Sequence, residues 1–230
     1  AGFCFGVERV LEDTAARLRN GESLVGLGEM VHNQAELKRL EAMGLKTIRH
    51  EDLSTTDSGK VLFRAHGEPP STYRIAAEAG LEVIDGTCPI VISLQKKIKA
   101  AYLKMDRAKE QLVIFGKPDH PETIGLMGQV DGDATVVSGP DEVGKIERGK
   151  QVHLFSQTTM DPEQYGEVEK AIQALAEHEP GPSRTVLFRS ECTICGQMKS
   201  RKPKLTAFAQ QHSVILFVSG KNSSNGKMLF

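Results

Sequence analysis

The chain has 230 residues, of which 39% are hydrophobic and 26% charged, and its formal net charge at pH 7 is −1. This composition is typical of a globular protein of one or two domains with a substantial buried core, and it offers no extended basic surface for nucleic acid. No run approaches the ~18–20 apolar residues of a membrane helix, and no signal peptide opens the chain, so we expect a cytoplasmic protein that binds neither membrane nor nucleic acid.

The recurring unit along the chain is a short apolar strand, a polar or glycine-rich turn and an amphipathic helix. Strands are predicted at 25–27, 61–63, 112–115, 152–155 and 214–218, and helices follow at 35–43, 72–79, 123–127 and 162–178. Strands that alternate with helices at this spacing indicate βαβ units and parallel sheets, so the predicted fold class is α/β. The polar clusters follow the strands directly, where open α/β sheets bind their ligands.

A second repeat involves three of the four cysteines. Cys4, Cys88 and Cys195 each stand directly before a predicted helix, at 7–18, 91–104 and 197–210, and strands at 83–84 and 186–188 precede the second and third. The cysteines are separated by about the length of one α/β domain. We therefore expect three similar α/β domains, at 5–87, 88–188 and 189–230, arranged so that the three cysteines meet at a shared centre. The third is expected to be incomplete, with residues 1–4 packing at that centre.

The chemistry of the three cysteines leaves several interpretations open. A thiolate at a helix N-terminus has a lowered pKa and is ready to bind metal. Only Cys192 and Cys195 form a C-x₂-C pair, which makes a structural zinc site a weak prediction. Three thiolates could instead hold a 4Fe–4S cluster with one iron open to a substrate oxygen. The plain alternative is three cysteines that pack as small apolar residues.

Further polar residues follow the predicted strands and suit phosphate oxygens. They are the histidines His32, His66 and His120 and the loop residues Ser223, Ser224 and Asn225. Glu122 could donate a proton from a desolvated pocket, although a glutamate at a helix start is also favoured by the helix dipole alone. Thr158 and Thr159 could simply cap a helix. The basic stretch 199–204 is interpreted as a solvated helix start.

The order and spacing of eight short motifs are highly specific together. They are AGFCFGV at 1–7, GEMVHN at 28–33, RAHGEPP at 64–70, DGTCP at 85–89, HPE at 120–122, SQTT at 156–159, TIC at 193–195 and SSN at 223–225. In these motifs the chain resembles the LytB/IspH family of 4-hydroxy-3-methylbut-2-enyl diphosphate reductases. The resemblance runs from the first residue to the last few.

This resemblance implies a trefoil of three α/β domains around a 4Fe–4S cluster held by Cys4, Cys88 and Cys195. It implies a diphosphate site formed by His32, His66, His120, Thr158, Ser223, Ser224 and Asn225. Glu122, working with Thr158, would supply the proton as the allylic hydroxyl leaves as water. Two electrons, delivered singly by ferredoxin, flavodoxin or a similar carrier, would convert the substrate to isopentenyl and dimethylallyl diphosphates in the non-mevalonate isoprenoid pathway.

Some features depart from the family pattern. The chain starts without Met at Ala1 and stops at Phe230, so we expect a fragment truncated at both ends. Cys192 is an extra thiol near a predicted ligand, and we expect it to be inert. Two rival hypotheses remain at this stage: a metal-dependent hydrolase that uses the histidines, and a non-catalytic or turnover-deficient diphosphate-binding fragment.

Overall fold

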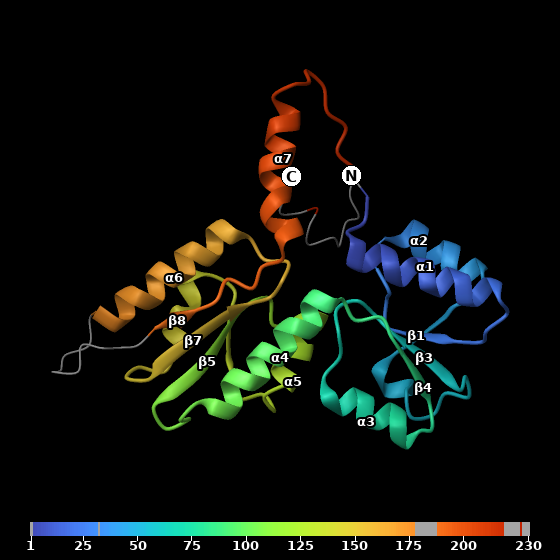
Figure 1. The fold of residues 1–230 in the computed structure, drawn as a ribbon, viewed down its shortest axis with the longest axis horizontal. Coiled ribbons are helices and arrows are strands. Elements are labelled where there is room, and N and C mark those ends of the chain that lie inside the picture. The colour runs from blue at the N-terminus through green and yellow to red at the C-terminus, as the bar shows by residue number, and fades with distance from the viewer. Residues whose placement is uncertain (1, 32, 178–187, 219–225, 227–230) are drawn as a thin grey trace. The chain divides into compact units, whose positions relative to one another are not determined.

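The computed structural model describes residues 2–31, 33–177, 188–218 and 226, which form two compact units (Figure 1). One unit is built mainly on residues 1–92 and the other on residues 93–215. Each unit contains a four-stranded sheet in which every pairing is parallel.

The first unit has its sheet in the order β2-β1-β3-β4. The strands are β1 (Val25–Leu27), β2 (Lys46–Ile48), β3 (Lys60–Phe63) and β4 (Glu82–Asp85), and the helices are α1 (Phe5–Arg19), α2 (Gln34–Ala42) and α3 (Pro70–Glu78), with a 3₁₀ turn, η1, at His50–Asp52. The chain moves from β1 to one side of the sheet and then returns to the other side at β3. The loops after β1 and β3 therefore leave the sheet side by side, at the switch point where open α/β sheets bind ligands.

Alternating side chains build a separate core on each face of this sheet. Leu62 and Ile84 pack with α1 and α2, whose apolar side chains include Leu11 and Leu40. On the opposite face, β1 and β3 pack with Ala76 of α3 and with neighbouring apolar residues. This alternation follows from the two-residue period of a strand, and both faces are apolar because helices cover both.

The second unit repeats the plan, with its sheet in the order β6-β5-β7-β8. The strands are β5 (Glu110–Phe115), β6 (Thr135–Val137), β7 (Gln151–Ser156) and β8 (Arg189–Ser190). The helices are α4 (Pro89–Lys104), α5 (Pro121–Gly128), α6 (Pro162–Glu177) and α7 (Gly196–Ala209), and a 3₁₀ turn, η2, lies at Pro140–Lys145. The first residues of α4 belong to the first unit. Here the switch point lies between β5 and β7, so the loops at 116–120 and 157–161 begin next to each other.

The helices bury apolar stripes and expose polar faces. In α4, Leu94 and Ile98 pack against Leu112 and Ile114 of β5 and against Leu126 of α5. Apolar positions three or four residues apart define such a helix face. No helix within the described ranges is long and apolar enough to cross a membrane.

The predicted α/β class with parallel sheets is confirmed, and the strands predicted at 25–27, 61–63, 112–115 and 152–155 are present. The strand predicted at 214–218 is wrong, because these residues form no strand and Val214, Leu216 and Val218 are each more than 80% exposed. An apolar run becomes a strand only where a neighbouring strand accepts its hydrogen bonds, and no described strand pairs with this one. Before Cys195 the described strand is β8, and residues 186 and 187 lie outside the described residues. The three-domain division stays a prediction.

Candidate functional site

All three predicted ligand cysteines stand at helix starts. Cys4 and Cys195 are the N-cap residues of α1 and α7, and Cys88 directly precedes α4. Their carbonyl groups accept the first backbone hydrogen bonds of these helices, from Glu8, Met198 and Ile92 among others. Each of the three cysteines is half-buried, so each has the helix-terminus setting that favours a thiolate.

The surroundings of Cys88 are shaped by a glycine of α1. A Cβ atom placed on Gly6 would lie 2.7 Å from the Cys88 Sγ, closer than real Cβ atoms approach. Gly6 is buried, so a larger residue there would have to displace the thiol. The Gly6 position therefore keeps space beside the Cys88 sulfur atom.

The structure places the predicted ligands in different units: Cys4 and Cys88 lie in the first and Cys195 in the second. Among the described residues, no three His, Cys, Asp or Glu side chains lie in an arrangement that could hold a metal ion. The 4Fe–4S cluster therefore remains a prediction that rests on the three cysteines as possible ligands. The fourth thiol, Cys192, is exposed, and its backbone carbonyl accepts a hydrogen bond from the Lys199 Nζ.

The switch point of the second sheet brings together Glu122 and Thr158. Glu122 is 1% exposed, and its two carboxylate oxygens accept hydrogen bonds from the Thr158 backbone N–H at 2.6 Å and from the Thr158 hydroxyl at 2.8 Å. Burial, which disfavours the charged form, raises the pKa of Glu122 to about 7, although both hydrogen bonds from Thr158 act in the opposite direction. A carboxyl with this pKa can hold and release a proton near neutral pH.

His120 contributes to the same arrangement. It is the N-cap of α5, and its Nδ1 accepts a hydrogen bond from the Glu122 backbone N–H at 3.1 Å. A nitrogen that accepts carries no proton, so the neutral ring of His120 is protonated at Nε2. His120, Glu122 and Thr158 are thus joined by side-chain hydrogen bonds within one unit.

Of the remaining predicted site residues, the structure describes His66 alone. His66 lies half-buried in the turn after β3, where Ala65 accepts a hydrogen bond from the Cys88 backbone N–H at 3.0 Å. The turn that carries His66 is therefore bonded to the segment that carries Cys88. His32, Ser223, Ser224 and Asn225 lie outside the described residues.

Two residues of the quoted motifs have positions that sequence reasoning missed. Gln157 is fully buried; its Oε1 accepts hydrogen bonds from the Lys117 backbone N–H and the Thr123 hydroxyl, and its Nε2 donates to Thr159. Thr193 uses its hydroxyl to bond both the N–H and the carbonyl of Ser156. A polar residue inside a motif at a strand end is a signal for such a role, but its partners are distant in sequence.

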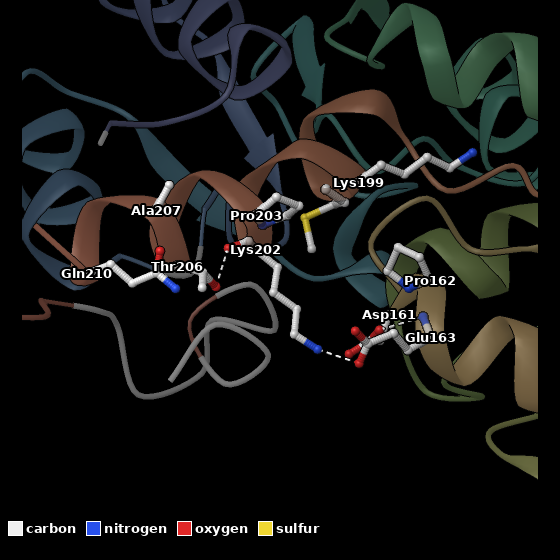
Figure 2. Close-up of a pocket in the computed structure, with 10 residues that line it drawn as sticks. Asp161, Pro162, Glu163, Lys199, Lys202, Pro203, Thr206, Ala207 and Gln210 are labelled. Atoms are coloured by element: carbon white, nitrogen blue, oxygen red, sulfur yellow. Dashed lines mark hydrogen bonds and ion pairs between the residues drawn. The ribbon is translucent and has the colours of Figure 1, made fainter.

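A cavity of about 450 Å³ lies elsewhere in the second unit, between α7 and the start of α6 (Figure 2). It is lined by Asp161, Pro162, Glu163, Met198, Lys199, Lys202, Pro203, Thr206, Ala207 and Gln210. An ion pair joins Lys202 to Glu163 across it (Figure 2). Of the predicted catalytic, substrate-binding and metal residues that the structure describes, none lines this cavity.

The chain matches a family model described as LytB protein over residues 1–230. It is 46% identical over 230 residues to a Bacteroides fragilis protein named 4-hydroxy-3-methylbut-2-enyl diphosphate reductase, covering 100% of this chain and 77% of that protein. A protein of the same name from Bacteroides thetaiotaomicron is 45% identical, with 100% of this chain and 78% of the relative covered.

Two solved structures share the fold. A Plasmodium falciparum structure titled E-1-hydroxy-2-methyl-but-2-enyl-4-diphosphate reductase has a TM-score of 0.82 at 24% identity, covering 99% of this chain and 69% of that one. A second structure, titled (E)-4-hydroxy-3-methyl-but-2-enyl diphosphate reductase, the terminal enzyme of the non-mevalonate pathway, has a TM-score of 0.74 at 29% identity, covering 100% and 78%. The first supports the fold alone, and the second supports the same relationship as the curated relatives.

Proposed function

Because the chain belongs to the LytB protein family, we propose that it is a 4-hydroxy-3-methylbut-2-enyl diphosphate reductase of the non-mevalonate isoprenoid pathway. The reaction removes an allylic hydroxyl as water, consumes two electrons and two protons, and yields isopentenyl and dimethylallyl diphosphates. The observation that carries the proposal is the buried Glu122 carboxyl bonded to Thr158, because this chemistry needs a proton donor in a dry site.

Cys4, Cys88 and Cys195 would hold a 4Fe–4S cluster. The fit is supported by three half-buried cysteines at helix starts and by the space that Gly6 leaves beside the Cys88 sulfur atom. When bound, such a cluster supplies electrons one at a time and offers one iron as a Lewis acid. Free cysteines also suit a reducing compartment, which agrees with a cytoplasmic location.

Glu122 and Thr158 would deliver the proton. At a pKa of about 7, roughly half of the Glu122 carboxyl groups are protonated at neutral pH. Once protonated, Glu122 can donate to the Thr158 hydroxyl, which then donates to the leaving oxygen of the substrate. The backbone N–H of Thr158 holds the other carboxylate oxygen and so fixes the direction of transfer.

The diphosphate would be bound by imidazole, hydroxyl and amide groups. His120, protonated at Nε2, His66 and Thr158 are the described members of this set. His32, Ser223, Ser224 and Asn225 complete it as proposed residues outside the described ranges. These groups donate hydrogen bonds to phosphate oxygens without adding a large positive charge. The electron donor is proposed to be ferredoxin, flavodoxin or a similar small carrier.

The test begins with anaerobic purification, iron and sulfide analysis and a visible spectrum. A brown protein with about four irons and four sulfides per chain supports the proposal, and so does conversion of a colourless preparation by anaerobic reconstitution. A protein that stays colourless after reconstitution, or that binds a single colourless metal ion, would contradict it. The second result would favour a metal-dependent hydrolase.

Glu122→Gln separates proton delivery from binding. With chemically reduced electron donor, kcat is expected to fall about 100-fold or more, while substrate affinity changes little, because glutamine keeps the shape but donates no acidic proton. Equal losses in kcat and affinity would argue against the proton-transfer role. An unchanged kcat would favour a different proton donor.

A further inference from the structure

An ion pair lies at the switch point of the first sheet, in the turn after β3. The Arg64 side chain is 11% exposed and the Glu68 side chain 3%, and the Arg64 Nε lies 3.5 Å from the Glu68 Oε1. The turn that they bracket contains His66, a proposed diphosphate ligand. The proton transfer and cluster binding proposed above use neither Arg64 nor Glu68.

Arg64 also reaches the loop that follows β1. A Cβ atom on Gly28 would lie 2.8 Å from the Arg64 Nη1, so the guanidinium packs directly against the Gly28 backbone. Gly28 has a φ of +68°, which L side chains rarely adopt, so both its conformation and its contact with Arg64 favour glycine. The Glu29 carboxylate attracts the same guanidinium. Arg64 therefore joins the turn of His66 to the loop that leads to His32.

Glu68 joins the same turn to a third segment of the first unit, the 3₁₀ turn η1. Its Oε2 lies 2.8 Å from the Nε2 of His50, at the start of η1. Within the turn, the Gly67 N–H donates to the Arg64 carbonyl at 3.1 Å. Ala65 of the same turn accepts the hydrogen bond of the Cys88 backbone N–H, so the turn is bonded to a second segment of the first unit.

We propose that Arg64 and Glu68 are positioning residues, which hold the His66 turn and the Gly28 loop in the orientation that binds the diphosphate. The proposal deepens the proposed function and depends on it. A buried ion pair often contributes little net stability relative to apolar packing, because both charges are desolvated. The planar, forked guanidinium of Arg64 does fix the relative orientation of the groups that it contacts, however, and the single ammonium group of a lysine cannot reproduce that orientation.

The experiment measures binding of inorganic pyrophosphate by isothermal titration calorimetry, and KM and kcat for the diphosphate substrate with the reconstituted protein. The variants are Arg64→Gln, Arg64→Lys and Glu68→Gln. Arg17→Gln is the matched control, because Arg17 also pairs with two carboxylates of the first unit, Asp13 and Glu22, but at a more exposed position on α1.

Arg64→Gln and Glu68→Gln are expected to weaken pyrophosphate binding and raise KM by about tenfold, with kcat changed less than about threefold. Arg64→Lys should restore only part of the affinity, and Arg17→Gln should bind like the parent chain. Thermal unfolding of each variant tests the structural alternative. If Arg64→Gln does not fold, Arg64→Lys and Glu68→Gln carry the same comparison.

The outcomes distinguish this proposal from the proposed function. If the parent chain binds pyrophosphate and the Arg64 and Glu68 variants bind it equally well, the positioning role is overturned while the diphosphate site stands. Variants that lose thermal stability but keep their affinity and KM would overturn the positioning role in the same way. A parent chain that binds neither pyrophosphate nor substrate would overturn the proposed function and this proposal together.

Discussion

Replacing Glu122 with glutamine removes a buried titratable group while keeping the size and shape of its side chain. The folded-state pKa is about 7, against 4.5 for an unburied glutamate. Because the folded value is the higher one, the stability linked to this proton is fully present below about pH 4.5 and is lost as the pH rises through 7. A difference of about 2.5 units corresponds to about 3 kcal/mol of unfolding free energy.

Urea unfolding followed by circular dichroism at a series of pH values between 4.5 and 8 measures this effect. The unfolding free energy of the parent chain should contain a decline of about 3 kcal/mol over that range which Glu122→Gln lacks. The comparison is a difference between two proteins at each pH, so titration of the other groups largely cancels. A carboxyl signal in ¹³C NMR that titrates near 7 and disappears in the variant would identify the group directly.

Glu167→Gln provides the control, since this glutamate is exposed on α6 in the same unit. It should leave the pH dependence of the parent chain in place. If Glu122→Gln and the parent chain show parallel curves of unfolding free energy against pH, the reasoning from burial to a raised pKa is refuted. If the Glu167→Gln control lost the decline of unfolding free energy with pH, that result would also contradict the reasoning.

Three further substitutions test individual contacts. Thr158→Val removes the hydroxyl that favours the ionised form of Glu122, so the pKa of Glu122 should rise further, by about one unit in a ¹³C NMR titration. Gly6→Ala places a Cβ against the Cys88 sulfur atom and should lower the free energy of unfolding in urea by about 1–3 kcal/mol. The same substitution should change the rate at which the Cys88 thiol reacts with a labelling reagent. Gln157→Leu leaves the Lys117 backbone N–H and the buried Thr123 hydroxyl without their acceptor, and it should lower the free energy of unfolding in urea by about 2–3 kcal/mol.

The parallel sheets could be predicted from local patterns. The segments 61–63 and 112–115 are apolar at every position, as expected of strands covered by helices on both faces, and polar turns bound them. The positions of Cys4 and Cys195 before helices were visible for the same reason, because a helix start is encoded within a few residues. Glu122 is a candidate proton donor from the sequence alone; the structure buries its carboxyl, and its catalytic role stays a proposal.

The contacts that connect the loops could not be predicted in this way. Arg64 meets Gly28 only because β1 and β3 are neighbours, and the strand order depends on packing across the whole sheet. The same is true of Gln157, whose acceptor oxygen serves the Lys117 N–H forty residues earlier. Such partners are set by tertiary structure, and no local propensity encodes them.

The wrong strand at 214–218 has a related cause. Its composition is suited to a strand, but β-propensity describes how well a side chain fits a partly buried, pleated surface. In the described residues this run has no such surface, and Leu216 is 88% exposed. A pattern of apolar residues therefore predicts a strand only together with the neighbour that it needs.

In the second unit, one residue connects the proposed proton donor to a proposed cluster ligand. Thr158 bonds both carboxylate oxygens of Glu122, and its own carbonyl accepts the backbone N–H of Cys195 at 2.9 Å. Thr193 ties the same segment to Ser156 of β7 through two hydrogen bonds. A reductive dehydroxylation requires electrons and a proton at the same carbon–oxygen bond, and misplacement by about 1 Å can cost about 100-fold in rate. Because short backbone hydrogen bonds at the end of a sheet join the two groups, the distance between the proton source and this ligand segment is fixed by the fold itself.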